Sequence, residues 1–153
     1  MNNKTSIKAA ELLENIRKKV PLIWNFSNFV SMDIAANALL AIGASPAMAH
    51  AKEEANDFSQ ICKAINGALT INIGTFDPYW QECALEAASL ANKNSVPWVL
   101  DPVGAGASGF RNKNVDFLAA PLFVMSTCFS VFIVVFGTYN FGYNSFAKSR
   151  HAP

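Results

Sequence analysis

Hydrophobic residues in the first hundred positions recur in two alternating patterns, one typical of amphipathic helices and the other of short buried strands. Apolar positions three and four residues apart predict helices over about 7–20, 30–42, 53–65 and 78–93. Short apolar runs between these helices predict strands at 22–26, 45–48, 68–74 and 97–101. Strands joined by helices pack as a parallel sheet covered on both sides, so the pattern predicts an α/β fold with βαβ units.

Residues at the helix ends and on the helical faces make these predictions specific. Thr5 or Ser6 can cap the first helix, Pro21 ends it, and Gly43 closes the second. The apolar positions expected to face the core are Ile7, Ala10, Leu13, Ile16 and Val20 in the first helix, Val30, Ile34, Ala35, Ala38, Leu39 and Ile42 in the second, and Ala84, Ala87, Ala88 and Ala91 in the fourth.

Polar and glycine-rich segments follow three of the predicted strands, at the ends where parallel α/β folds bind ligands. They contain Asn25, Ser27 and Asn28 after the first strand, Asn72, Gly74 and Thr75 after the third, and Asp101, Gly104, Ala105, Gly106 and Ser108 after the fourth. Because the carboxyl ends of parallel strands lie at one edge of a sheet, we expect these residues to converge on one site.

The DPVGAGASGFR segment after the fourth predicted strand has two interpretations. A carboxylate leaving an apolar strand, followed by small residues at a helix start, could bind phosphate or Mg²⁺ through Asp101, Gly104 and Gly106. The same residues could instead form a tight turn capped by Asp101. Asn28 is likewise typical of turns and caps, and Met48 is typical of core filler. The segment lacks the lysine of a P-loop.

Composition narrows the classes of function. Apolar residues make up 52% and charged residues 15% of the 153 positions, which excludes a disordered chain. The net charge of +1 supplies no basic excess for nucleic acid, which is not expected as a partner. The 3 cysteines lack CxxC spacing, which argues against a disulfide framework and suits the cytoplasm. Two of them, Cys62 and Cys83, fall on predicted helices, where we expect them to be buried and inert.

The composition changes near the end of this region. No charged residue occurs from 117 to 147, and the stretch 117–137 is as long as the roughly 20 residues that cross a bilayer. We therefore expect two regions, 1–120 and an apolar tail over 121–153. Three interpretations of the tail stay open: non-coding read-through or an alternative end, a membrane segment that anchors the protein, or an apolar stretch that packs over the sheet.

Three segments resemble, in order and with matching spacing, the N-terminal half of the hydroxyethylthiazole kinases, which have a ribokinase-like fold. They are NFVSMDIAANALLAIGASPAMAHAKEE (28–54), INIGT (71–75) and VPWVLDPVGAGASGFR (96–111). The resemblance runs from about Lys18 to about Ala120. It implies an enzyme of thiamine salvage that uses ATP and Mg²⁺ to phosphorylate the hydroxyl group of 4-methyl-5-(2-hydroxyethyl)thiazole.

The resemblance also implies roles for individual residues on the substrate side. Asn28 and Val30 match residues that line the thiazole pocket of the family, and Met48 matches its substrate-binding methionine. Such walls suit a flat, weakly polar ring. The family's enzymes are homotrimers in which thiazole lies between subunits, so a homotrimer is expected if the full domain is present.

On the phosphate side, the resemblance implies that Asp101 lies near the metal and the phosphates, with Gly104 and Gly106 in the same ATP-side segment. Carboxylate-held Mg²⁺ and helix-end amides can neutralise the charge that develops in phosphoryl transfer.

The resemblance stops near residue 120. The family's glycine-rich cysteine loop is not matched at Cys128, which follows Met125, Ser126 and Thr127, so the catalytic residue stays unknown. Residues 1–120 are therefore expected to be part of a kinase domain. Two other functions remain possible: a non-catalytic, membrane-associated fragment of such a kinase, or a kinase of another small alcohol.

Overall fold

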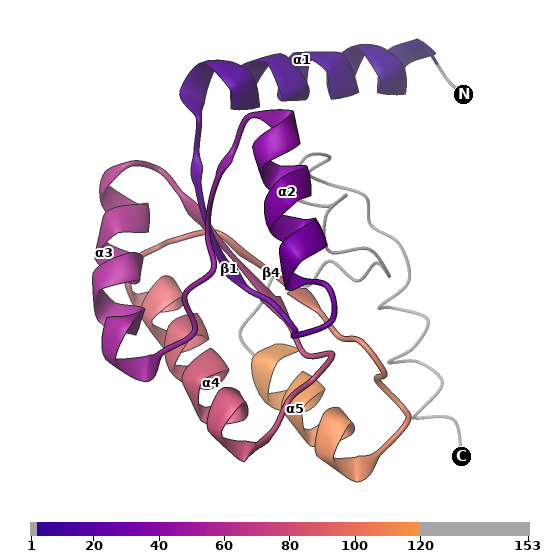
Figure 1. Cartoon of the computed structure of the whole chain (residues 1–153), viewed down its shortest axis with the longest axis vertical. Helices are drawn as coiled ribbons and strands as arrows, with labels where there is room; N and C mark the ends of the chain where they lie inside the picture. Colours follow the sequence, from indigo (N-terminus) through magenta and orange to yellow (C-terminus); the bar gives the residue numbers. More distant parts are fainter. Residues whose placement is uncertain (1–2, 120–153) are drawn as a thin grey trace.

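Four parallel strands form a sheet at the centre of the structure, a computed structural model that describes residues 3–119 (Figure 1). In spatial order the strands are β2 (Ser45–Ala47), β1 (Leu22–Phe26), β3 (Ala68–Asn72) and β4 (Trp98–Asp101). Each coincides with a predicted strand to within two residues at either end, and every pairing is parallel. The predicted α/β fold with βαβ units is confirmed.

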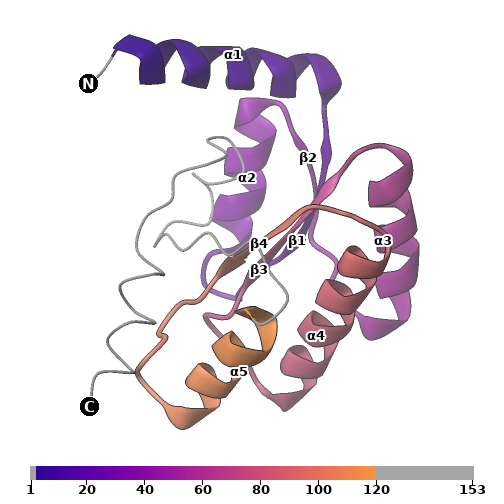
Figure 2. The same ribbon diagram turned by 180° about the vertical axis from the view of Figure 1, so that it is seen from behind.

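Helices lie on both faces of this sheet (Figures 1 and 2). They are α1 (Asn3–Lys19), α2 (Met32–Ile42), the short 3-10 helix η1 (Lys52–Glu54), α3 (Ala55–Ala64), α4 (Pro78–Lys93) and α5 (Gly109–Ala119). Figure 2 shows α3 and α4 on one side of the strands and α2 on the other, with α1 lying across the end of α2.

The larger hydrophobic core lies between the sheet and the helices α3, α4 and α5. The strand residues that fill it are Trp24, Phe26, Leu69, Ile71 and Leu100, all almost fully buried. On the opposite face, a smaller core joins Ile23 of β1 to Leu39 of α2 and to Ala44. The strand residues that alternate with these core residues, among them Thr70, Asn72 and Asp101, face the side of the smaller core, where they are hydrogen-bonded.

Helix α4 and the end of α2 agree closely with prediction. Asp77 caps α4 by accepting a hydrogen bond from the Trp80 amide at 2.7 Å, and Pro78 takes the first helical position. The four alanines predicted to face the core are at most 5% exposed. Gly43 ends α2 in the left-handed conformation with φ of 94°, as its position predicted.

The predicted buried faces of α1 and α2 are wrong in part. On α1, Ile7 is 54% exposed, and Val20, just beyond the helix, is 55% exposed. At the start of α2, Val30 and Ile34 are 82% and 68% exposed, whereas Leu39 is buried. The physical reason is that periodicity shows which side chains share a helical face, but not how much of that face another element covers.

Within residues 3–119, no helix is both long enough and apolar enough to cross a membrane. The stretch 117–137 enters this part of the chain only with 117–119, at the end of α5. The membrane-segment prediction and the other interpretations of 121–153 therefore concern residues outside those that the structure describes.

Candidate active site

The polar segments that follow β1, β3 and β4 lie where these strands end, at one edge of the sheet (Figure 2). The register places Asn25 opposite Thr70 and Asn72 opposite Asp101. Alternation along the strands directs these side chains to the same face as Ile23, away from the larger core. The Thr70 hydroxyl donates to Asn25 Oδ1 at 2.9 Å in a buried hydrogen bond. This face of the sheet therefore carries a stripe of polar groups.

Three buried side chains link the ends of β1, β3 and β4. Asn28 Nδ2 donates to Asn72 Oδ1 at 2.7 Å, and Asn72 Nδ2 donates to Asp101 Oδ2 at 2.7 Å. Their exposed fractions are 7%, 4% and 6%. The structure thus brings Asn28 and Asp101, both predicted site residues, into one chain of hydrogen bonds through Asn72, which we call the Asn28–Asn72–Asp101 chain.

The loop between β1 and α2 is organised around Asn28. Its Oδ1 accepts hydrogen bonds from the Val30 and Ser31 amides at 2.9 and 3.0 Å, which is the turn-forming role predicted for an asparagine here. The Phe29 amide donates to Thr75 Oγ1 at 3.1 Å. These bonds hold the loop against the segment that follows β3, with the Val30 side chain exposed beside them.

Two hydroxyl groups of the same loop are buried without a hydrogen-bond partner within the part of the chain that the structure describes. They belong to Ser27, which is 4% exposed, and Ser31. Buried polar groups are nearly always paired in folded proteins, so each unpaired one needs an explanation. At the carboxyl edge of a parallel sheet, a bound polar ligand is a reasonable one.

Arg111 of α5 ties together the segments that follow β3 and β4. Its Nη1 donates to the carbonyl oxygens of Ile73 and Val103 at 2.6 and 2.8 Å, and its Nη2 donates to that of Gly74 at 2.7 Å. The aliphatic part of the side chain fills the space beside Gly104, where an added Cβ would lie 3.0 Å from Arg111 Cδ. We call this arrangement the Arg111 clamp.

The glycines of the DPVGAG segment form a turn, which both interpretations of the segment allow. Gly104 and Gly106 have φ of 72° and 91°, values that favour glycine. Inside the turn, the Ala105 amide donates to the Pro102 carbonyl at 3.0 Å, and the Gly106 amide donates to Asn112 Oδ1 at 2.7 Å. These two amides are thus already engaged, so phosphate contacts of the segment, which stay a prediction, would involve other donors or a change in the turn.

The predicted substrate-side methionine lies in the loop that follows β2, at the same edge of the sheet. Met48 is partly buried. The indole Nε1 of Trp24 on β1 donates to the carbonyl oxygen of the adjacent Ala49 at 2.9 Å, which fixes this loop relative to the strand. The structure therefore places Met48 and the loop around Asn28 at the ends of the neighbouring strands β2 and β1.

Aromatic rings pack together beside the loop that joins β1 to α2. The Trp80 ring at the start of α4 lies 4.1 Å from that of Phe29, 4.6 Å from that of His50 and 5.9 Å from that of Phe26, between ring centroids. His50, for which no role was predicted, is thus part of an aromatic cluster. The cluster supports the loop from the side of α4.

Two residues that organise the site were not singled out by the sequence. Asn72 appears only as one of several polar residues at strand ends, and its distinguishing signal is a lone amide at the end of an otherwise apolar strand. Arg111 gave no signal, because its partners are backbone carbonyl oxygens, which every segment offers.

The Asp101 carboxylate, at the end of β4, is the predicted Mg²⁺ ligand that the structure places at this edge of the sheet. No group of three or more His, Cys, Asp or Glu side chains suited to holding a metal occurs within residues 3–119. Mg²⁺ usually binds through one or two carboxylates together with water and substrate phosphates. The donor set therefore fits an ion that arrives with a nucleotide and does not form a closed metal cage.

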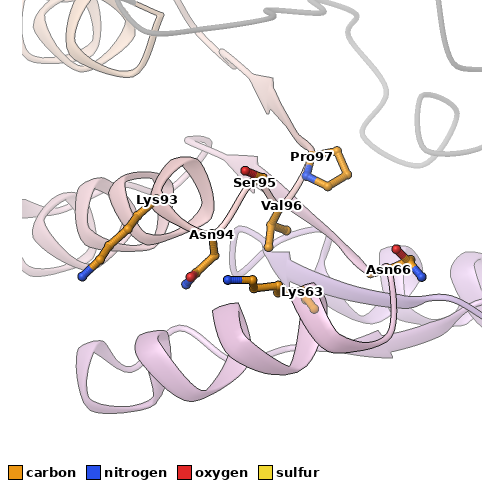
Figure 3. A pocket seen from close by; sticks show the side chains of 9 residues that line it. Lys63, Asn66, Lys93, Asn94, Ser95, Val96 and Pro97 are labelled. Carbon is orange, nitrogen blue, oxygen red and sulfur yellow. The ribbon is translucent and has the colours of Figure 1, made fainter.

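A hollow of about 390 Å³ lies at the opposite ends of β3 and β4, away from the candidate site (Figure 3). Its lining comes from the ends of α3 and α4 and the segments that follow them, and includes Lys63, Lys93 and Asn94. Cys62 also lines it, and burial raises the pKa of its thiol. Both Cys62 and Cys83 are buried, as predicted, and neither forms a disulfide. No predicted site residue contributes to this hollow.

Comparisons with known proteins give a consistent result. The sequence model of the "Hydroxyethylthiazole kinase family" matches residues 13–124. The chain is 50% identical over 115 residues to a hydroxyethylthiazole kinase of Rhizobium rhizogenes, and 52% identical over 103 residues to one of Caldivirga maquilingensis. These alignments cover 75% and 67% of this chain, and 41% and 37% of the relatives.

Among solved structures, the fold resembles that of a hydroxyethylthiazole kinase protein from Pyrococcus horikoshii. The TM-score is 0.72 at 40% sequence identity, over 78% of this chain and 46% of that one. The chain thus spans about two fifths of the length of the curated relatives it matches.

Proposed function

The chain belongs to the hydroxyethylthiazole kinase family, and we propose on this premise that its site serves the ATP-dependent phosphorylation of the hydroxyl group of 4-methyl-5-(2-hydroxyethyl)thiazole. The observation that carries the proposal is the Asn28–Asn72–Asp101 chain. It joins a residue on the alcohol side to one on the phosphate side, at the edge of the sheet where such folds bind their ligands.

On the alcohol side, we assign Asn28, Val30 and Met48 to the thiazole ring. Val30 and Met48 would supply apolar walls, and Asn28 would fix the orientation of the loop that presents Val30. The unpaired hydroxyls of Ser27 and Ser31 in the same loop support a polar ligand there. Together these groups combine apolar walls with a few polar contacts, as small-molecule sites do.

On the phosphate side, we assign Asp101 to Mg²⁺ that accompanies ATP, with Gly104 and Gly106 shaping the turn beside it. Mg²⁺ would neutralise charge on the transferred phosphoryl group. The contribution of the chain is then to hold the carboxylate in place and to align the alcohol, because phosphoryl transfer asks mainly for positioning and charge stabilisation. The group that accepts the proton of the alcohol stays unassigned.

Replacing Met48 by alanine should raise the concentration of thiazole alcohol that half-saturates the protein by roughly 10-fold, because contact between a methionine side chain and the ring is worth about 1 to 2 kcal/mol. Met48→Leu should keep most of the affinity, since its volume is similar. The measurement is the shift in Tm against the concentration of the alcohol.

Leu90→Ala is the matched control for Met48→Ala, because Leu90 on α4 is also a partly buried apolar residue but packs against the larger core. It should lower Tm without moving the half-saturating concentration. If the wild-type chain binds other small primary alcohols and not the thiazole alcohol, the substrate assignment is wrong while the kinase fold stands.

We also propose that the homotrimer of the family forms through the start of α2. Phe29, Val30 and Ile34 are 62%, 82% and 68% exposed, an apolar surface of the kind that marks protein contacts. We call these three residues the α2 patch.

We propose the cytoplasm as the compartment, with which the two buried cysteines, neither in a disulfide, are compatible. The described residues and the relatives give no support to a membrane-associated fragment.

Ile34→Asp should therefore shift the chain from trimer to monomer, because a carboxylate would be desolvated at the contact. Light scattering coupled to gel filtration measures the mass. Ile7→Asp, on the exposed side of α1 outside the α2 patch, is the control and should leave the mass unchanged. A wild-type chain that is monomeric at all concentrations would contradict the proposed contact.

A further inference from the structure

We propose that Asn72 is a positioning residue that orients the Asp101 carboxylate toward a divalent cation and couples it to the alcohol-side loop around Asn28. This inference rests on the proposed function and deepens it. Neither the likeness to relatives nor the sequence pattern assigns Asn72 a role. The reasons are the polarity of its hydrogen bonds, its burial, and its place between the two halves of the site.

The chemistry of its neighbours fixes which way the Asn72 amide faces. The Asp101 carboxylate only accepts hydrogen bonds, so the Asn72 NH₂ group must face it. The Gly74 amide only donates, and it lies 2.8 Å from Asn72 Oδ1, so the Asn72 side-chain carbonyl must face Gly74. Asn28 Nδ2 donates to the same oxygen. A residue with both a donor and an acceptor is needed at this point.

The polarity continues along the chain of hydrogen bonds. Because Asn28 uses its NH₂ group on Asn72, its own Oδ1 is directed to the Val30 and Ser31 amides. The conformation of the alcohol-side loop is thereby matched to the direction of the Asp101 carboxylate. Sequence separations of 44 and 29 residues are bridged by two short bonds.

Burial makes these bonds consequential. Asn72 is 4% exposed, so water cannot readily replace a lost partner, and removal of the amide would leave the Asp101 carboxylate and the Asn28 amide each short of one bond. Partners that orient a metal-binding side chain typically change metal affinity roughly 10- to 100-fold when they are removed. An effect of this kind reaches the cation through Asp101 and not by direct contact.

The test measures binding of Mn²⁺ to the full chain by the loss of the electron paramagnetic resonance signal of the free ion. Asn72→Ala should raise the Kd for Mn²⁺ roughly 10-fold. Thr70→Val is the matched control, because it removes another buried side-chain hydrogen bond of the same sheet face, 2.9 Å long, without touching Asp101. It should lower Tm but leave the Kd for Mn²⁺ within about 2-fold of wild type.

Coupling is tested by repeating the titration with the thiazole alcohol present. In the wild-type chain the alcohol should change the Kd for Mn²⁺, and Mn²⁺ should change the Kd for the alcohol by the same factor. In Asn72→Ala this factor should fall to about 1, because the connection between the two halves is lost.

A double variant tests whether the hydrogen bond between positions 72 and 101 contributes to stability. Asn72→Asp combined with Asp101→Asn exchanges the donor and the acceptor of this contact, so the amide at position 101 can donate to the carboxylate at position 72. The Tm of the double variant should therefore lie above that of Asn72→Ala and near that of wild type. Mn²⁺ binding should be weak, because this variant lacks the Asp101 carboxylate to which we assign the ion.

The outcomes distinguish this inference from the proposed function. If the wild-type chain binds Mn²⁺ and the alcohol, but Asn72→Ala binds both as tightly and with the same coupling, the positioning role is wrong and the proposed function stands. If Thr70→Val weakens Mn²⁺ binding as much as Asn72→Ala, the effect is general destabilisation and the role is again wrong. If the wild-type chain binds neither Mn²⁺ nor the alcohol, the proposed function and the positioning role of Asn72 are both wrong.

Discussion

Arg111→Ala should lower the free energy of unfolding by about 3 kcal/mol, because hydrogen bonds from a charged donor contribute about 1.5 to 3 kcal/mol each and are not fully additive. The variant removes three bonds, to the carbonyl oxygens of Ile73, Gly74 and Val103. It also empties the space beside Gly104 that the aliphatic part of the side chain fills. Urea denaturation followed by circular dichroism measures the change.

The same variant should loosen the two segments that the Arg111 clamp joins. Amide hydrogen exchange around 73–75 and 102–106 is therefore expected to accelerate more than exchange in β1. Arg111→Lys keeps the charge but not the planar fork of donors, so it should recover only part of the stability. Lys113→Ala is the control on the same helix. Equal losses for the two alanine variants would mean that the clamp does not form in solution.

Much of the fold follows from local signals in the sequence. Helix α4 has the predicted bounds because Asp77 and Pro78 determine its start and the spacing of its alanines determines its buried face. The end of α2 at Gly43 follows equally from a local requirement, the left-handed conformation. In each case the residues that decide the element lie within a few positions of one another.

The buried faces of α1 and α2 could not be predicted in the same way. Ile34 and Ile7 recur at helical spacing like any core residue, yet both are largely exposed. What covers a helical face is decided by elements distant in the chain or by another molecule, and periodicity carries no information about either.

The candidate site was likewise predictable only in part. Asn28 and Asp101 were expected to converge because both follow predicted parallel strands, and the structure joins them. That they meet through Asn72 depends on the register of β3 against β4, which pairs Asn72 with Asp101. A shift of one residue would turn Asn72 into the opposite core. Register is set by the whole sheet, so the sequence indicated that Asn28 and Asp101 lie near each other but not that Asn72 joins them.

Gly74→Ala should lower the free energy of unfolding by about 2 kcal/mol, within the range expected for an added methyl group in a packed site. The new Cβ would lie 2.9 Å from Asn28 Nδ2 and 3.0 Å from Asn72 Oδ1. Neither amide can move aside cheaply, because each is buried and held by further hydrogen bonds. The Asn28–Asn72–Asp101 chain must therefore distort, and thiazole alcohol and Mn²⁺ should both bind more weakly.

Gly109→Ala provides the matched comparison, since a Cβ at Gly109, in the first turn of α5, would have no atom within 4 Å. That variant should be as stable as wild type or more stable by about 0.5 kcal/mol, because alanine restricts the unfolded chain and favours the helix. Thermal unfolding with and without the two ligands separates the cases. If Gly74→Ala unfolds at the wild-type temperature and binds both ligands normally, the amides of Asn28 and Asn72 are not packed against this glycine in solution. The loop would then adjust independently of the carboxylate, and the two halves of the site would not be connected at this point.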